Sequence, residues 1–126
     1  MVSGKLDGKE MLSSGSDMKF ITAKHFIYIA QDKAKTISAI AKKTKEDPLT
    51  AYMDSFRAGS GTYKLEGNKY TETIEFSADP IYIGRSFDFT MRVEGNRLYQ
   101  SGKFPLYENG KKVRDALLEE VYERVE

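Results

Sequence analysis

Cysteine is absent from the 126-residue sequence, and histidine occurs once. The lack of thiols excludes disulfides, Cys-based zinc sites and thiol catalysis. One imidazole cannot supply an ordinary His-based metal site, so we predict no metal and no cofactor. No apolar run approaches the about 20 residues of a transmembrane helix, so we expect no membrane span. The formal net charge is +1, without a block of one sign, which argues against nucleic acid or an anionic membrane as a partner.

Motifs for nucleotide binding are also missing, since the sequence contains no phosphate loop and no dinucleotide fingerprint. It also contains no Ser-centred nucleophile elbow of the kind that hydrolases use. Residues 1–10 contain no apolar segment of the kind that a signal peptide requires. We therefore expect no signal peptide in this chain. Its compartment stays open: cytoplasmic, or secreted or periplasmic after removal of a leader. The length fits a single domain, residues 1–126, and 40% hydrophobic with 31% charged residues is the composition of a soluble globular protein.

Aromatic residues give the main structural signal. Eight Tyr and seven Phe fall mostly in runs that alternate with polar residues, as in β-strands. Met18–Gln31 predicts two short strands joined tightly, or one strand with a bulge. From Gly61 onward the sequence predicts an antiparallel β-meander. Its turns are Glu66-Gly67-Asn68, Glu94-Gly95-Asn96 and Asn109-Gly110.

One short helix is predicted near residues 47–57. Asp47-Pro48 combines an N-cap with a proline at the first helical position, and Gly59 fits a C-cap. The apolar residues that follow at helical spacing are Leu49, Tyr52, Met53 and Phe56. Such a face normally packs on a core. The alternative is a lid over a barrel mouth, with Met53 at the pocket entrance.

Several other segments are shorter or ambiguous. Val2–Leu6 predicts a frayed strand that ends in a turn at Asp7-Gly8. Thr36–Ala41 fits a strand or a helical turn equally well, and Ile81–Ile83 fits a short strand. The C-terminal segment from Leu117 has the apolar spacing of a helix but is also compatible with a closing strand.

A family resemblance rests on the order and spacing of several short motifs from Lys19 onward. They are His25-Phe26, Gly61-Thr62-Tyr63, Glu66-Gly67-Asn68, Tyr70 to Glu75, Ile83-Gly84, Val93 to Gly102 and Glu120 to Val125. Together they resemble bacterial lipocalin-like domains of uncharacterised function, of the calycin type. The resemblance implies an all-β, up-and-down antiparallel barrel of about eight strands. It also implies that the C-terminal segment is a strand.

Two departures from the resembling domains affect the ends of the barrel. Those domains open with a Gly-x-Trp strand that this chain lacks, and they carry Trp where Tyr122 stands. We therefore expect a missing or shortened first strand, a barrel open at one seam, and a homodimer through that open edge. The resemblance further implies a structural role for Arg124 at the closed end of the barrel, where it packs over an aromatic residue such as Tyr122.

Glu72 is the most informative polar residue because it alternates with Tyr70, Ile74 and Phe76. If that face points inward, its carboxylate must be paired or protonated. Three interpretations follow, in order of preference: a structural pair with an internal Arg or Tyr, contact with a ligand, and general acid or base catalysis. His25 is first a core or rim residue; a functional role would require a nearby carboxylate, for which Glu72 is the natural candidate.

These observations favour a binding module that holds a small hydrophobic or amphipathic molecule. Two alternatives remain: a structural or protein-interaction barrel with a filled interior, and a small enzyme that uses Glu72 with His25. The residues expected to line the lumen are His25, Met53, Tyr70, Glu72, Phe87, Phe89 and Tyr99.

Overall fold

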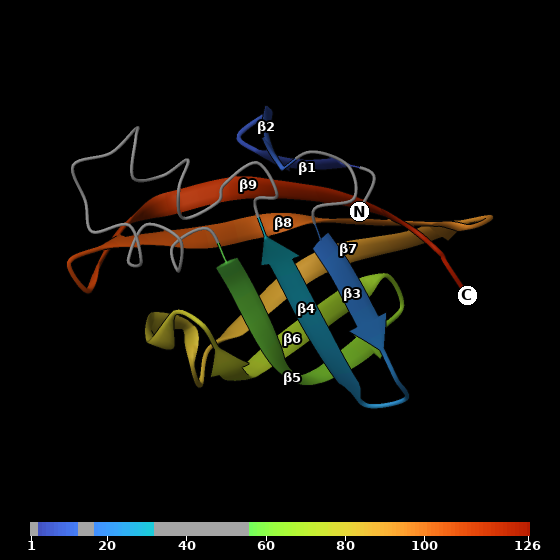
Figure 1. Ribbon diagram of the computed structural model, residues 1–126, viewed down its shortest axis with the longest axis horizontal. Helices are drawn as coiled ribbons and strands as arrows, with labels where there is room; N and C mark the ends of the chain where they lie inside the picture. The colour runs from blue at the N-terminus through green and yellow to red at the C-terminus, as the bar shows by residue number, and fades with distance from the viewer. Residues whose placement is uncertain (1–2, 13–16, 32–55) are drawn as a thin grey trace, which may run out of the picture.

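The computed structural model describes residues 3–12, 17–31 and 56–126, whose arrangement is shown in Figure 1. These described residues form nine β-strands in one antiparallel sheet and one 3-10 turn, η1 (Pro80–Tyr82). The strands are β1 (Ser3–Leu6), β2 (Lys9–Leu12), β3 (Asp17–Ile21), β4 (His25–Gln31), β5 (Phe56–Glu66), β6 (Lys69–Ser77), β7 (Ser86–Glu94), β8 (Arg97–Glu108) and β9 (Lys111–Glu123).

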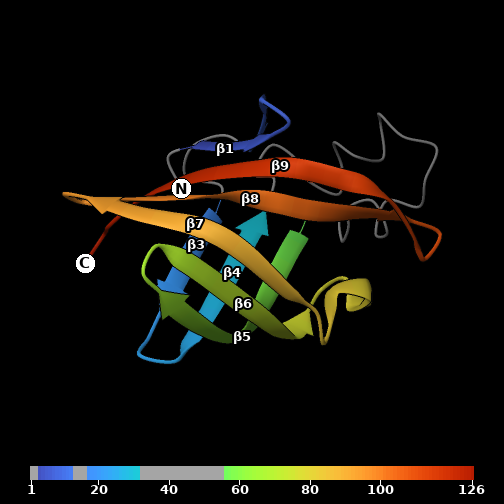
Figure 2. The same ribbon diagram turned by 180° about the vertical axis from the view of Figure 1, so that it is seen from behind.

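The sheet is an up-and-down meander from β3 to β9, because each of these strands pairs with the next one in sequence. Strand β1 then pairs with β9, and β2 pairs with β1. The sheet curls into a half-barrel, in which β3, β4 and β5 run steeply across the direction of β8 and β9 (Figures 1 and 2). Within the described residues, β2 and β3 stand at opposite ends of the strand order. The prediction of an antiparallel, barrel-like all-β fold is thus confirmed, with a sheet that is open between these two strands.

The turns between strands have the backbone conformation that their residues favour. Asn109 and Gly110 both have positive φ, 51° and 76°, which suits a tight hairpin between the long strands β8 and β9. Gly67 and Gly95 also have positive φ, where the absence of a Cβ removes the steric cost. Asp7 and Gly8 form the turn of the β1–β2 hairpin. The hairpin turns predicted from the sequence are therefore confirmed.

The ambiguous segments are now assigned. Met18–Gln31 lies in two strands, β3 and β4, joined by a short turn, and the C-terminal segment is strand β9, as the resemblance implied. Ile81–Ile83 is not a strand, because Asp79 caps η1 by accepting a hydrogen bond from the Ile81 amide at 3.1 Å.

The helix predicted near residues 47–57 falls largely outside the described residues, as do Met53 and Thr36–Ala41. Its last predicted apolar residue, Phe56, is instead the first residue of β5, where it stands opposite Gln31 of β4. Gly59 lies within the same strand and is not a helix C-cap. At Phe56 and Gly59, hydrogen bonding to β4 outweighs the local helical spacing, since every residue of β4 pairs with β5.

The core lies on the concave side of the sheet, and strict alternation along each strand sets which residues enter it. On β6, Tyr70, Glu72 and Ile74 are buried, and on β7 Phe87 and Phe89 are buried. The same alternation applies to β9. The buried apolar residues are Phe26, Ala30, Tyr70, Ile74, Phe87, Phe89, Ala116, Leu118 and Tyr122.

Candidate functional site

A lysine lies at the centre of the polar part of the core. Alternation on β3 turns Lys19 inward, and only 4% of its side chain is exposed. Its ammonium group forms an ion pair with the Glu72 carboxylate of β6, which is 9% exposed. The same ammonium donates to the Gln100 side-chain oxygen of β8 at 2.8 Å. Three strands that are distant in sequence therefore meet at one buried positive charge.

Aromatic rings surround this charge. The Lys19 nitrogen lies 4.9 Å from the ring centroid of Tyr70, 5.4 Å from that of Phe26 and 5.9 Å from that of Tyr122. Cations within about 6 Å of an aromatic centroid are attracted by the ring quadrupole, and more strongly in a desolvated place. The position is thus built for a cation, from two acceptor oxygens and three rings.

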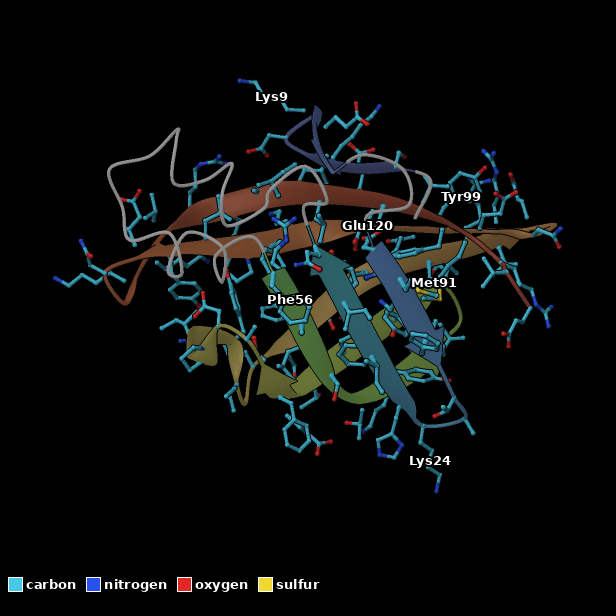
Figure 3. The ribbon with its side chains drawn as sticks, in the orientation of Figure 1. Lys9, Lys24, Phe56, Met91, Tyr99 and Glu120 are labelled. Carbon is cyan, nitrogen blue, oxygen red and sulfur yellow. The ribbon has the colours of Figure 1, made fainter. Side chains whose placement is uncertain are left out.

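A second buried carboxylate belongs to Glu120 of β9. It accepts a hydrogen bond from the Tyr122 hydroxyl at 2.6 Å. Burial raises the pKa of Glu120, and it outweighs the lowering effects of the Tyr122 hydrogen bond and the Lys19 charge. Burial and the neighbouring Glu120 charge both raise the pKa of Tyr122, which therefore stays a neutral donor. Figure 3 places Glu120 beside β8 and near β3 and β4, whereas Lys9 and Lys24 project away from the sheet.

Asp17 contributes a third buried carboxyl group from the start of β3. Burial raises its pKa, while Tyr28 and Arg57 act to lower it. The charge of Asp17 is one of the influences that raise the pKa of Glu120. The acidic groups of the inner face therefore form one interacting set.

Aromatic side chains form a second part of the inner face. Phe87 packs against Phe104, with ring centroids 5.2 Å apart, and against Tyr82 at 5.9 Å. The Tyr82 hydroxyl donates to the Pro105 carbonyl at 3.2 Å, which ties η1 to β8. Phe89 belongs to the same buried apolar cluster as Phe87 and as Tyr70, whose ring lies beside Lys19. The arrangement suits an amphipathic molecule, since one region carries charge and the neighbouring region is aromatic.

Strand alternation places some of the predicted lumen residues on the inner face of the sheet and others on the outer face. Tyr70, Glu72, Phe87 and Phe89 are buried on the inner face, as expected for lining residues. His25 is exposed, because it shares the outer face of β4 with Ile27 and Ile29 while Phe26 points inward. The prediction of His25 as a lumen residue is therefore wrong.

Tyr99 is also misplaced by the prediction. Tyr99 lies on the outer face of β8, because its neighbour Gln100 is buried on the inner face. The Arg92 guanidinium lies 4.1 Å from the centroid of the Tyr99 ring.

The two residues expected to close the barrel behave differently from each other. Tyr122 is buried at the inner face, but Arg124 is exposed beyond the end of β9. The Arg124 amide donates to the Asn96 carbonyl at 2.8 Å, which anchors the chain end to the β7–β8 turn. The cation that lies over the Tyr122 ring is Lys19. Lys19, from near the other end of the chain, thus takes the position over an aromatic ring that was expected for Arg124.

Glu72 is paired, as the preferred interpretation required, although its partner is Lys19 rather than an Arg. Lys19, Gln100 and Glu120 were missed by the sequence reasoning. Glu120 carried the same signal as Glu72, since it alternates with Leu118 and Tyr122. Lys19 carried the opposite signal, because the apolar residues on either side of it are the ones that face outward.

Metal binding has no evident place here: among the residues described, no group of three or more His, Asp or Glu side chains is arranged to hold an ion. In the same part of the chain, none of the helical turns has the length and apolar character needed to cross a bilayer. Comparisons with protein-family models, with curated proteins and with solved structures find no match for this chain.

Proposed function

We propose that this chain is a binding module that holds a small amphipathic molecule on the concave side of its sheet. The observation that carries the proposal is the buried Lys19–Glu72–Gln100 cluster beside an aromatic wall. Ligand sites combine a mostly apolar lining with a few converging polar groups. In this proposal the polar end of the ligand contacts the cluster, and its apolar end lies against Phe87 and Phe89.

A relationship to lipocalin-like domains is part of the proposal. The consecutive meander and the pairing of the C-terminal strand β9 with the N-terminal strand β1 support it. Barrels of about eight strands hold either packed side chains or one small ligand. Because one fold can serve many functions, the ligand proposal rests on the side chains of the inner face.

Catalysis by Glu72 with His25 is not supported. The two side chains belong to opposite faces of the sheet, because Glu72 is buried inside and His25 is exposed outside. Glu72 is also engaged by Lys19.

Native mass spectrometry of protein purified without denaturation tests the binding proposal. We expect an adduct that is lost when the same sample is denatured. Replacing Glu72 with Gln keeps the side-chain shape but removes the charge, and it should reduce the adduct. Glu75→Gln is the matched control, since Glu75 is exposed on the same strand. Absence of an adduct, together with no binding of fluorescent amphiphiles, would contradict the proposal and favour a filled barrel.

A second candidate function, self-association, is favoured by a specific surface. Met18 stands opposite Ile29, and Phe20 opposite Ile27, on the outer face of β3 and β4. These four side chains are 45%, 37%, 49% and 49% exposed, respectively. Contiguous exposed apolar patches mark interaction sites, and β3 stands at one end of the described sheet.

The proposed partner is a second copy of the chain, which would cover this patch at the open edge of the sheet. Sedimentation at micromolar concentration should then show a dimer. Phe20→Ser should shift it to a monomer, whereas Val93→Ser, which changes an exposed apolar residue on β7, should not. A monomeric parent protein would contradict self-association without affecting the ligand proposal.

A further inference from the structure

Lys19 and Gln100 bring an amine and a carboxamide into direct contact inside the fold. The Lys19 Nζ atom donates to the Gln100 side-chain oxygen at 2.8 Å. Because a carbonyl bond is about 1.2 Å long, Nζ lies within about 4 Å of the Gln100 Cδ carbon. Atoms that are about to react are held about 3–3.5 Å apart. The lysine nitrogen is therefore close to attack distance of the amide carbon.

The Glu72 carboxylate completes the set, because it contacts the same Lys19 nitrogen. A lysine amine can attack a carbonyl carbon, but only after the ammonium group has given up a proton. A carboxylate in contact with that nitrogen is placed to accept the proton as a general base. Both side chains are buried, and a poorly solvated place reduces the advantage of an ion pair over a neutral amine and carboxylic acid.

The surroundings exclude water and fix the reacting groups. Gln100 is only 2% exposed, and three aromatic rings lie within 5.9 Å of Nζ, those of Phe26, Tyr70 and Tyr122. A site closed to water suppresses side reactions and strengthens the electrostatic interactions within it. Groups held in place by a scaffold react as if one of them were present at an effective concentration of up to about 10⁵–10⁸ M.

We propose that Lys19 and Gln100 form an intramolecular isopeptide bond, with Glu72 as the base. Glu72 takes one proton from the Lys19 ammonium, and the Nζ lone pair attacks Cδ to form the new N–C bond. A second proton passes from Nζ through Glu72 to the Gln100 Nε2 atom, the Cδ–Nε2 bond breaks, and ammonia leaves. The proton that remains on Glu72 then goes to ammonia, so the products are an amide, a carboxylate and an ammonium ion.

The bond would join β3 to β8 across the inner face. The two residues are separated by 81 positions in the chain, and β3 stands at one end of the described strand order. A covalent link over so long a loop restricts the unfolded chain, as a disulfide does, in a sequence that has no cysteine. The inference does not depend on ligand binding. The ion pair is the unreacted state, and stability measurements on freshly prepared protein of full mass report on it.

Mass spectrometry of the denatured, unaltered chain tests the inference, with samples taken at purification and during incubation at neutral pH. We expect a species that is lighter by one ammonia molecule, either from the first sample or increasing with time. Trypsin should release from it peptide 10–24 joined to peptide 98–103, because trypsin does not cleave after an acylated lysine. Fragmentation should place the bond between Lys19 and Gln100.

Three variants assign the roles. Lys19→Arg keeps the positive charge without the amine and should abolish the lighter species. Lys24→Arg, in the exposed turn between β3 and β4, is the matched control and should leave it unchanged. Glu72→Leu adds no second amide and should slow formation of the bond about a hundredfold or more. Circular dichroism checks the fold of each variant, and the measurement on the unaltered chain stands without them.

Several results would overturn the inference. One is a chain that keeps its full mass throughout the incubation. Another is the loss of water with a bond between Lys19 and Glu72, because Gln100 would then not be the partner. A third is the loss of ammonia at an asparagine while trypsin still cleaves after Lys19. None of these results bears on ligand binding, which the adduct in native mass spectrometry reports separately.

Discussion

Replacing Lys19 with Met should destabilise the fold strongly, because it leaves the Glu72 carboxylate buried without its ammonium partner. Both side chains are more than nine-tenths buried. Removing one member of a buried ion pair typically costs about 3–5 kcal/mol. Domains of this size are stable by only about 5–15 kcal/mol in total. Met preserves most of the apolar stem of Lys, so the loss reports mainly on the charge.

Urea denaturation followed by circular dichroism measures the effect. With an ordinary slope of about 1–3 kcal/mol per molar urea, the midpoint should fall by about 1 M or more. The double variant Lys19→Met with Glu72→Leu should recover most of the loss, because replacing a whole buried pair by apolar residues is often neutral or stabilising. The two single costs should therefore not add in the double variant.

An exposed ion pair in the same sheet is the control. Lys69 and Asp88 lie 3.7 Å apart, and both are largely exposed. Lys69→Met should cost less than about 1 kcal/mol, as expected for a surface pair. The reasoning is refuted if Lys19→Met costs no more than Lys69→Met, or if the costs at Lys19 and Glu72 are additive. Either result would mean that the buried pair contributes nothing specific.

Two further predictions concern burial and close packing. Burial raises the pKa of Glu120 in the folded protein above its ordinary value of 4.5. The folded protein therefore holds this proton more tightly than the unfolded chain does, which adds to its stability at low pH. That contribution is lost as the pH rises from 4.5 through the folded-state pKa. Urea titrations between pH 4 and 8 should therefore show Glu120→Gln gaining stability relative to the parent as the pH rises; a constant difference would contradict the raised pKa. Gly102→Ala should cost about 1–3 kcal/mol, since its Cβ would lie 2.6 Å from the Asp88 carbonyl oxygen. Urea denaturation measures the loss, with Gly59→Ala as the control, because that Cβ would meet the Phe76 carbonyl oxygen at an ordinary 3.8 Å; equal losses in the two variants would contradict the steric argument.

Strand positions were readable from local signals. The period-two alternation on β6 and β7 placed Tyr70, Phe87 and Phe89 on one face, and the turn at Asn109-Gly110 marked the long β8–β9 hairpin correctly. These signals are local because side-chain direction alternates with each residue and turns need particular φ values. The apolar spacing after Pro48 failed at Phe56 for the complementary reason. A short helical pattern carries little information when a neighbouring strand can pair across the same residues.

Candidate site residues were predicted less completely. Glu72 was recognised because a carboxylate interrupts an apolar face, and the same reasoning extends to Glu120. His25 was misplaced because its face, shared with Ile27 and Ile29, is apolar and yet points outward. On β3 the apolar residues Met18 and Phe20 lie outside, and β4 carries apolar residues on both faces, so hydrophobicity alone does not indicate which side of the sheet faces the core.

By itself, the sequence determined that this chain forms an antiparallel, mainly β structure with these turns, because backbone conformation and alternation are properties of neighbouring residues. It also determined that Glu72 must be paired if buried. Only the tertiary structure decided the partner. Lys19 and Glu72 are separated by 53 positions and Lys19 and Gln100 by 81, and the curl of the sheet brings them to one point. Which face of β3 turns inward is decided by that curl, and no local pattern encodes it.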